Sequence, residues 1–230
     1  MNQGLQSVYV ADAGTIASVE QRNRVLRNTY GLLALSMVPT ILGAWLGVST
    51  GLVRGMGVGM SAIVFLIGAY GFIFAIEKNK NSAAGVPILL AFTFFMGLML
   101  SRLLSVVLGQ ANGAGVVMTA FAGTGTVFLG MAVLSSVIKR DLSAMGKWLF
   151  IGAVMLLVAG LANIFIQSGA LMITIAVLAV GIFSAFILYD LKRVRDGEES
   201  NYISATLGVY LSTYNVFQSL LALLGIGNQD

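Results

Sequence analysis

The sequence contains nine acidic residues, and one of them, Asp190, directly follows a long apolar run. We assign the other eight to tails or loops. If that run crosses a membrane, the Asp190 carboxylate faces either the interior of a helical bundle or the membrane surface. A carboxylate in the interior commonly marks an ion or proton path. At the surface it would instead pair with Lys192 or Arg193, or cap the following loop. The residues around Asp190 leave both interpretations open.

A second group of polar residues lies in the segment 203–224. Its small and polar side chains recur at spacings of three or four residues, with further polar groups beside them: Ser204, Gly208, Ser212, Asn215 and Ser219, flanked by Tyr210, Tyr214 and Gln218. This spacing predicts one face of a helix. A face this polar indicates either hydrogen bonds between packed helices or the lining of a polar path. In the second case the proton-sensing or ion-path candidates are Asp190, Ser212 and Asn215.

The residue types exclude most enzyme chemistry. The sequence contains no cysteine and no histidine, which removes disulfides, Cys/His zinc sites, thiol nucleophiles and His-based triads. The acidic cluster Asp196, Glu198 and Glu199 lacks the spacing of a calcium-binding EF-hand loop. We expect it to form a solvated loop that favours the start of the next helix. We therefore predict no enzyme activity, no bound metal and no cofactor.

The elements that position these residues are apolar enough to be membrane spans. The chain is 58% apolar and 10% charged, with a mean hydropathy of +0.93, whereas soluble proteins are about 45–50% apolar and about 25% charged. A span needs about 20 apolar residues, so the 42 uncharged residues of 148–189 must form two helices with a turn near 167–169. We predict an all-α integral membrane protein with seven transmembrane helices, at 28–48, 55–76, 84–107, 114–137, 147–166, 169–189 and 203–224.

Three glycine pairs have the four-residue spacing that lets helix backbones approach closely in lipid. They are Gly43/Gly47, Gly51/Gly55 and Gly55/Gly59. We expect close contacts between helices at these positions.

Basic residues indicate the orientation of the spans. Eleven of the thirteen lysines and arginines lie on one side when the N-terminus is placed in the cytoplasm, and only Arg54 and Arg102 lie on the other. Because basic residues favour the cytoplasmic side, we predict a cytoplasmic N-terminal tail, 1–27, a transmembrane domain, 28–224, and a short non-cytoplasmic C-terminal tail, 225–230. This distribution explains the net charge of +4 without nucleic acid as a partner.

Seven short stretches resemble the Bax inhibitor family of multi-pass membrane proteins and, within it, the bacterial YccA-like branch. They occur in order along nearly the whole chain: RVLRNTY (24–30), GAYG (68–71), AFT (91–93), KRDLS (139–143), ANIF (162–165), NYI (201–203) and YNVF (214–217). The resemblance implies a bundle whose seventh helix is surrounded by the other six. That arrangement agrees with the polar face of the segment 203–224.

The resemblance implies two alternative activities. Some family members are pH-sensitive calcium leaks gated by two aspartates; Asp190 matches the first position, but Ser212 stands at the second, so the pair is incomplete. YccA-like members instead restrain the membrane AAA+ protease FtsH. We therefore predict a multi-pass protein of the bacterial inner membrane that modulates FtsH and can be its substrate. The alternative is a pH-sensitive calcium or cation leak channel, with calcium ions or protons as its partners.

Overall fold

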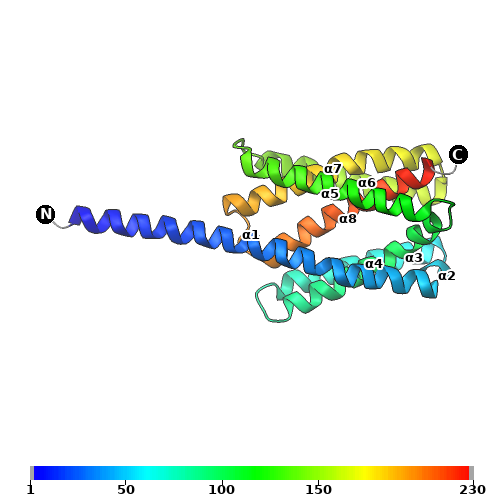
Figure 1. Ribbon diagram of the computed structural model, residues 1–230, viewed down its shortest axis with the longest axis horizontal. Helices are drawn as coiled ribbons and strands as arrows, with labels where there is room; N and C mark the ends of the chain where they lie inside the picture. The colour runs from blue at the N-terminus through cyan, green and yellow to red at the C-terminus, as the bar shows by residue number, and fades with distance from the viewer. Residues whose placement is uncertain (1–2, 228–230) are drawn as a thin grey trace.

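The structure is a computed structural model in which residues 3–227 are described, with side chains from residue 19 onward. This part of the chain is helical and contains no strand, in the order α1 (Gln3–Thr50), α2 (Leu52–Gly55), α3 (Val58–Asn79), α4 (Gly85–Leu108), α5 (Gly113–Val137), α6 (Ser143–Ile166), α7 (Gly169–Asp196) and α8 (Tyr202–Gly227) (Figure 1). Seven of the described helices are long and apolar enough to cross a membrane. The predicted all-α membrane protein with seven transmembrane helices is confirmed.

The spans begin and end within four residues of the predicted positions, except at the start of α1 and the end of α7, because charges and turns delimit them. The uncharged run 148–189 is divided between α6 and α7, as predicted. Gln167 adopts a left-handed conformation with φ 53°, and the Ser168 hydroxyl accepts a hydrogen bond from the Leu171 N–H at 3.2 Å. The hydroxyl thereby caps the first turn of α7.

The helix α1 extends far beyond the first predicted span. It continues without interruption through Pro39 and contains 48 residues, a length of about 72 Å. The hydrocarbon core of a bilayer is about 30 Å thick, so a large part of α1 lies outside that core. Its N-terminal part projects from the bundle (Figure 1).

The two predicted tails are helical where the structure describes them. Residues 3–27 belong to α1, and residues 225–227 belong to α8. Residues 1, 2 and 228–230 lie outside the described part of the chain. Once a helix is nucleated, each further residue adds a hydrogen bond at little cost, so the apolar part of α1 extends into its polar N-terminal segment.

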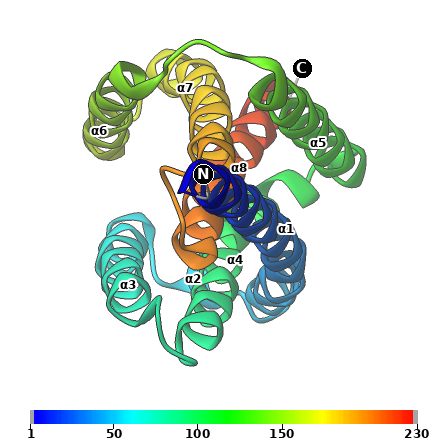
Figure 2. The same ribbon diagram turned by 90° about the vertical axis from the view of Figure 1, so that its left-hand side faces the viewer.

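The helix α8 lies in the centre of the bundle, as the resemblance implies. It packs against α1, α4, α5 and α7 and contacts α3, and Figure 2 shows these helices arranged around it. Several of its side chains are completely buried, among them Val209, Val216 and Leu221. The helix α6 lies at the periphery, where it packs against α7.

The helices α1 and α4 pack with their backbones in contact. A Cβ atom added to Gly43 would clash with the Phe94 carbonyl oxygen, and one added to Gly97 would clash with the Thr40 carbonyl oxygen. Gly47 is equally restricted, so the first predicted glycine pair is confirmed. The other two predicted pairs are wrong, because no atom lies within 4 Å of a Cβ added to any of their members. Those glycines surround the short helix α2, at one end of the bundle.

Candidate functional site

Asp190 lies in α7 with its carboxylate turned toward α8. A Cβ atom added to Gly208 of α8 would stand 3.0 Å from Asp190 Oδ2. The missing side chain of this glycine therefore makes room for the carboxylate beside the helix backbone. Asp190 is half-buried and lies near the end of the bundle where α7 ends and α8 begins.

Neither of the ion pairs considered for Asp190 forms. Lys192 pairs with Asp196, and Arg193 Nε lies 3.8 Å from Glu198 Oε2. Within the described part of the chain, the Asp190 carboxylate has no hydrogen bond and no ion pair. A charged carboxylate that is withdrawn from water between two helices costs free energy when it lacks a partner. Unpaired carboxylates in membrane bundles are often functional. The interpretation of Asp190 as a surface ion pair is therefore not supported.

The other two candidate residues occupy different positions on α8. Ser212 is buried one turn beyond Gly208, on the helix face that Asp190 contacts. The Asn215 amide donates a hydrogen bond to the Leu211 carbonyl oxygen at 2.8 Å, so it is turned back onto its own helix. The structure brings Asp190 within one helical turn of Ser212 and leaves Asn215 apart from them.

A second carboxylate, Glu77, lies beside the same part of α8. It belongs to α3 and not to a loop as predicted, and its Oε1 accepts a hydrogen bond from Ser204 Oγ at 2.9 Å. Ser204 precedes Gly208 by one turn, so the two carboxylates lie beside consecutive turns of α8. Glu77 directly follows an apolar run, as Asp190 does, and this signal would have identified it.

The opposite side of α8 is closed by hydrogen bonds from two buried tyrosines. The Tyr210 hydroxyl lies 2.9 Å from Thr40 Oγ1 on α1, and the Tyr214 hydroxyl donates to the Met96 carbonyl oxygen of α4 at 3.2 Å. These bonds join three spans, as is usual for polar side chains in a packed membrane bundle. The hydrogen-bond interpretation of the polar residues of α8 therefore applies to this side of the helix.

The end of α7 is held by polar contacts with α5. Arg195 donates hydrogen bonds to the carbonyl oxygens of Ser135 and Ile138, the latter at 2.9 Å, and to Asp196 at 2.8 Å. It thereby satisfies carbonyl groups that have no partner at the C-terminus of α5. Asp196, predicted to lie in a solvated loop, is instead the last residue of α7, and Gly197 ends that helix in a left-handed conformation with φ 83°.

Charged groups outside the spans also cap helices at this end. The Glu199 carboxylate accepts a hydrogen bond from the Asn201 N–H at 2.8 Å, beside the start of α8, where negative charge is favourable. Before α6, hydrogen bonds from the Ser143 hydroxyl and N–H hold the pKa of Asp141 below its usual range. Among the side chains of residues 19–227, no group of three or more acidic, histidine or cysteine residues is placed to hold a metal ion.

These features define a multi-pass helical membrane protein whose central helix has carboxylates beside one end. The family model described as "Inhibitor of apoptosis-promoting Bax1" matches residues 22–229. The chain therefore belongs to the Bax inhibitor family, and the family predicted from the short sequence stretches is confirmed.

Relatives match over most of their length. A Vibrio cholerae protein named "Uncharacterized membrane protein" is 38% identical over 214 residues, which cover 91% of this chain and 92% of the relative. The Escherichia coli K12 protein named "Modulator of FtsH protease YccA" is 36% identical over 213 residues, which cover 93% of this chain and 94% of the relative. The same identity and coverage hold for "Inner membrane protein YccA" of Escherichia coli O6:H1 strain CFT073.

Proposed function

We propose that this chain is an inner-membrane protein that modulates the membrane AAA+ protease FtsH and can serve as its substrate. The observation that carries this proposal is the similarity, over 93% of this chain, to the protein named "Modulator of FtsH protease YccA". The serine at position 212, where some leak members have a second aspartate, also favours an interaction function over an ion leak.

In this proposal the N-terminus lies in the cytoplasm. Because the seven spans alternate in direction, α3, α5 and α7 end on the side of the bundle from which α1 projects (Figure 1). We call this side the basic end, because it holds eleven of the thirteen basic residues: Arg22, Arg24, Arg27, Lys78, Lys80, Lys139, Arg140, Lys147, Lys192, Arg193 and Arg195. Basic residues favour the cytoplasmic side. A reporter fused after residue 230 should therefore be active outside the cytoplasm, and cytoplasmic activity would contradict this orientation.

The projecting part of α1 is well placed to meet a protease in the cytoplasm. The helix α1 joins the bundle at Arg22, whose side chain lies beside Gly197, and at Val25, which packs against Val194 and Ala205. The segment before these residues projects from the bundle (Figure 1). Terminal segments that stand away from a core are the usual sites at which proteases act.

Deletion of residues 2–20, in cells with and without active FtsH, tests the proposal. The deletion keeps the contacts of Arg22 and Val25, so insertion into the membrane should be unchanged while turnover of the protein slows. Pulse-chase labelling measures turnover, and deletion of residues 228–230 is the control. Unchanged turnover after the N-terminal deletion would exclude the projecting part of α1 from the mechanism. Failure of FtsH to copurify with the wild type, together with turnover that does not depend on FtsH, would contradict the proposal itself.

A pH-sensitive calcium or cation leak is the second candidate, favoured by the Asp190 carboxylate that lies against α8 without an ion pair. Cation flux into liposomes that contain the purified protein, followed from acidic to neutral pH, tests it. In this case Asp190→Asn loses the pH response of the wild type, whereas Glu20→Gln, a change at an exposed carboxylate without an ion pair among the described residues, keeps it. Absence of flux from the wild type at every pH would exclude the leak.

A further inference from the structure

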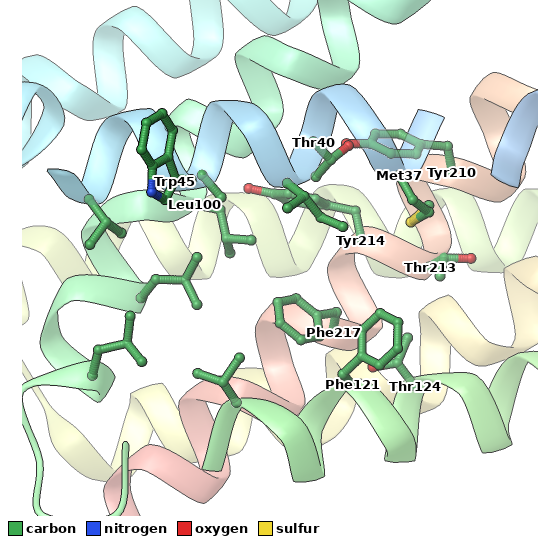
Figure 3. A pocket seen from close by; sticks show the side chains of 16 residues that line it. Met37, Thr40, Trp45, Leu100, Phe121, Thr124, Tyr210, Thr213, Tyr214 and Phe217 are labelled. Atoms are coloured by element: carbon green, nitrogen blue, oxygen red, sulfur yellow. The ribbon is translucent and has the colours of Figure 1, made fainter. Parts of the chain in front are cut away.

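An apolar groove runs along the side of the bundle between α1 and α5 (Figure 3). It consists of two adjoining cavities of about 400 and about 250 Å³, which share the lining residues Met37, Phe121, Thr124 and Thr213. The floor of the groove is α8, which contributes Phe217 and the two buried tyrosines. We call it the α1–α5 groove.

The lining of the α1–α5 groove offers few polar groups to a ligand. The hydroxyl groups of Thr40, Thr124, Tyr210, Thr213 and Tyr214 are already hydrogen-bonded within the protein. The remaining lining hydroxyl, that of Tyr30, lies at the start of the groove. Most of the remaining lining side chains are aliphatic or aromatic, such as Met37, Leu100 and Phe121. Because a polar group in this place would lose its bonds to water without gaining others, the occupant of the groove is apolar.

The size of the groove favours a chain over a helix. A transmembrane helix is about 10 Å wide and rises 5.4 Å per turn, so one turn fills about 420 Å³. The larger cavity, of about 400 Å³, would hold about one turn. An acyl chain is much narrower and can lie along the groove. The α1 wall, from Tyr30 to Val48, belongs to the uncharged part of the candidate span Val19–Thr50, the part that suits contact with acyl chains.

One end of the groove leads to arginines. Tyr30 lines the groove at its start, and Arg27 precedes it by three residues on the same face of α1, with Arg24 one turn earlier. Both arginines line a polar hollow at the basic end, together with one acid, Glu20, and residues before and at the start of α8. Neither arginine forms an ion pair within the described part of the chain.

We propose that the α1–α5 groove binds an anionic phospholipid from the leaflet at the basic end. The phosphate lies beside Arg27 and Arg24, and one acyl chain lies in the groove against α8. Guanidinium groups suit phosphate because they form paired, charge-assisted hydrogen bonds. The apolar lining accepts the chain, so the two parts of one lipid match the two parts of the site.

Photocrosslinking tests this proposal with the full chain in phosphatidylcholine nanodiscs. A small fraction of phosphatidylglycerol carries a diazirine near the end of its acyl chain, and mass spectrometry locates the labelled residues. We expect labels at Phe121 and Phe217 in the groove to exceed those at Phe150 and Met155, which are exposed on α6. Equal labelling of the two groups is the pattern of non-specific lipid and would overturn the proposal.

Gly125→Leu tests the place of the acyl chain. Gly125 lines the smaller cavity, and a Cβ added to it meets no atom within 4 Å. A leucine at this position can therefore leave the helix backbone without a clash and occupy part of the groove. Gly130→Leu is the matched control, because it lies on the same helix with the same free space outside the groove. Labelling of the groove should fall several-fold in the first variant only. Undiminished labelling in Gly125→Leu would overturn the proposed chain site.

Arg27→Gln tests the place of the headgroup. Loss of one arginine at an anionic surface should lower the preference for phosphatidylglycerol over phosphatidylcholine about fivefold. Lys147→Gln removes the same charge from the basic end on α6, away from the groove, and should keep the preference. Full preference in Arg27→Gln, or an equal loss in the control, would overturn the proposed headgroup site. Thermal unfolding confirms that each variant is folded.

Discussion

The two sides of α8 use their polar residues differently. On the side toward α1 and α4, the Tyr210 and Tyr214 hydroxyls are hydrogen-bonded and their rings are buried. On the side toward α7, the Asp190 carboxylate lies against Gly208 without a hydrogen bond or ion pair among the described residues. Paired polar groups stabilise a membrane bundle, whereas a carboxylate without a partner adds nothing to packing. A polar residue in a span can therefore be interpreted only when the structure shows whether it has a partner.

The largest effect should occur at the α1–α4 contact, next to the tyrosine side. In Gly97→Ala the added Cβ clashes with the Thr40 carbonyl oxygen, so the helices must separate, and the free energy of unfolding should fall by about 3 kcal/mol. Gly71→Ala on α3, where a Cβ meets no atom within 4 Å, is the control and should leave stability unchanged. Unfolding in mild detergent measures both, and equal stability of Gly97→Ala and the wild type would contradict the close packing of α1 and α4.

The second largest effect should come from Ser212→Asp, on the Asp190 side. This change places a carboxylate at a buried position one turn from Gly208, and it should cost about 2 kcal/mol at neutral pH. Two nearby carboxylates repel when both are charged, so the loss should shrink as the pH falls and protons bind. Ser212→Asn has a similar size without the charge and should show no such pH dependence. A loss of stability that is the same at all pH values would show that position 212 does not interact with Asp190.

A smaller effect is expected for Tyr210→Phe on the tyrosine side. The change removes the bond to Thr40, and the free energy of unfolding should fall by about 1 kcal/mol. Thr40 keeps its own bond to the Ser36 carbonyl oxygen at 2.8 Å, so its hydroxyl is not left without a partner. Tyr70→Phe, at an exposed tyrosine, serves as the control. If the two variants are equally stable, the tyrosine side is held by packing alone.

The smallest effect on stability should be that of Asp190→Asn. The variant removes an unpaired, half-buried charge and no hydrogen bond. It therefore also removes the cost of burying that charge, and the free energy of unfolding should not fall. The measurement is made beside Tyr210→Phe in the same detergent. A loss as large as that of Tyr210→Phe would show that Asp190 has a structural partner and would remove the contrast between the two sides of α8.

The family resemblance implied the central place of α8. The polar face of the segment 203–224 agrees with it, because a helix surrounded by protein can carry groups that lipid would exclude. The same face could not show which polar groups are paired. Thr40 and Tyr210 meet although 170 positions separate them in the chain. The sequence prediction also assigned Glu77 to a loop, whereas α3 continues past it and Ser204 donates to its carboxylate.

By itself, the sequence determined the number of spans, most of their limits and the position of most basic residues at one end. These are properties of each segment alone, since the thickness of the bilayer sets how many apolar residues a span needs. Only the tertiary structure decided that Asp190 meets Gly208, that Lys192 turns to Asp196, and that a groove lies between α1 and α5. Those features depend on how each helix is rotated about its axis and how closely it approaches its neighbours. Contacts between distant segments, such as that of Gly97 with Thr40, determine both.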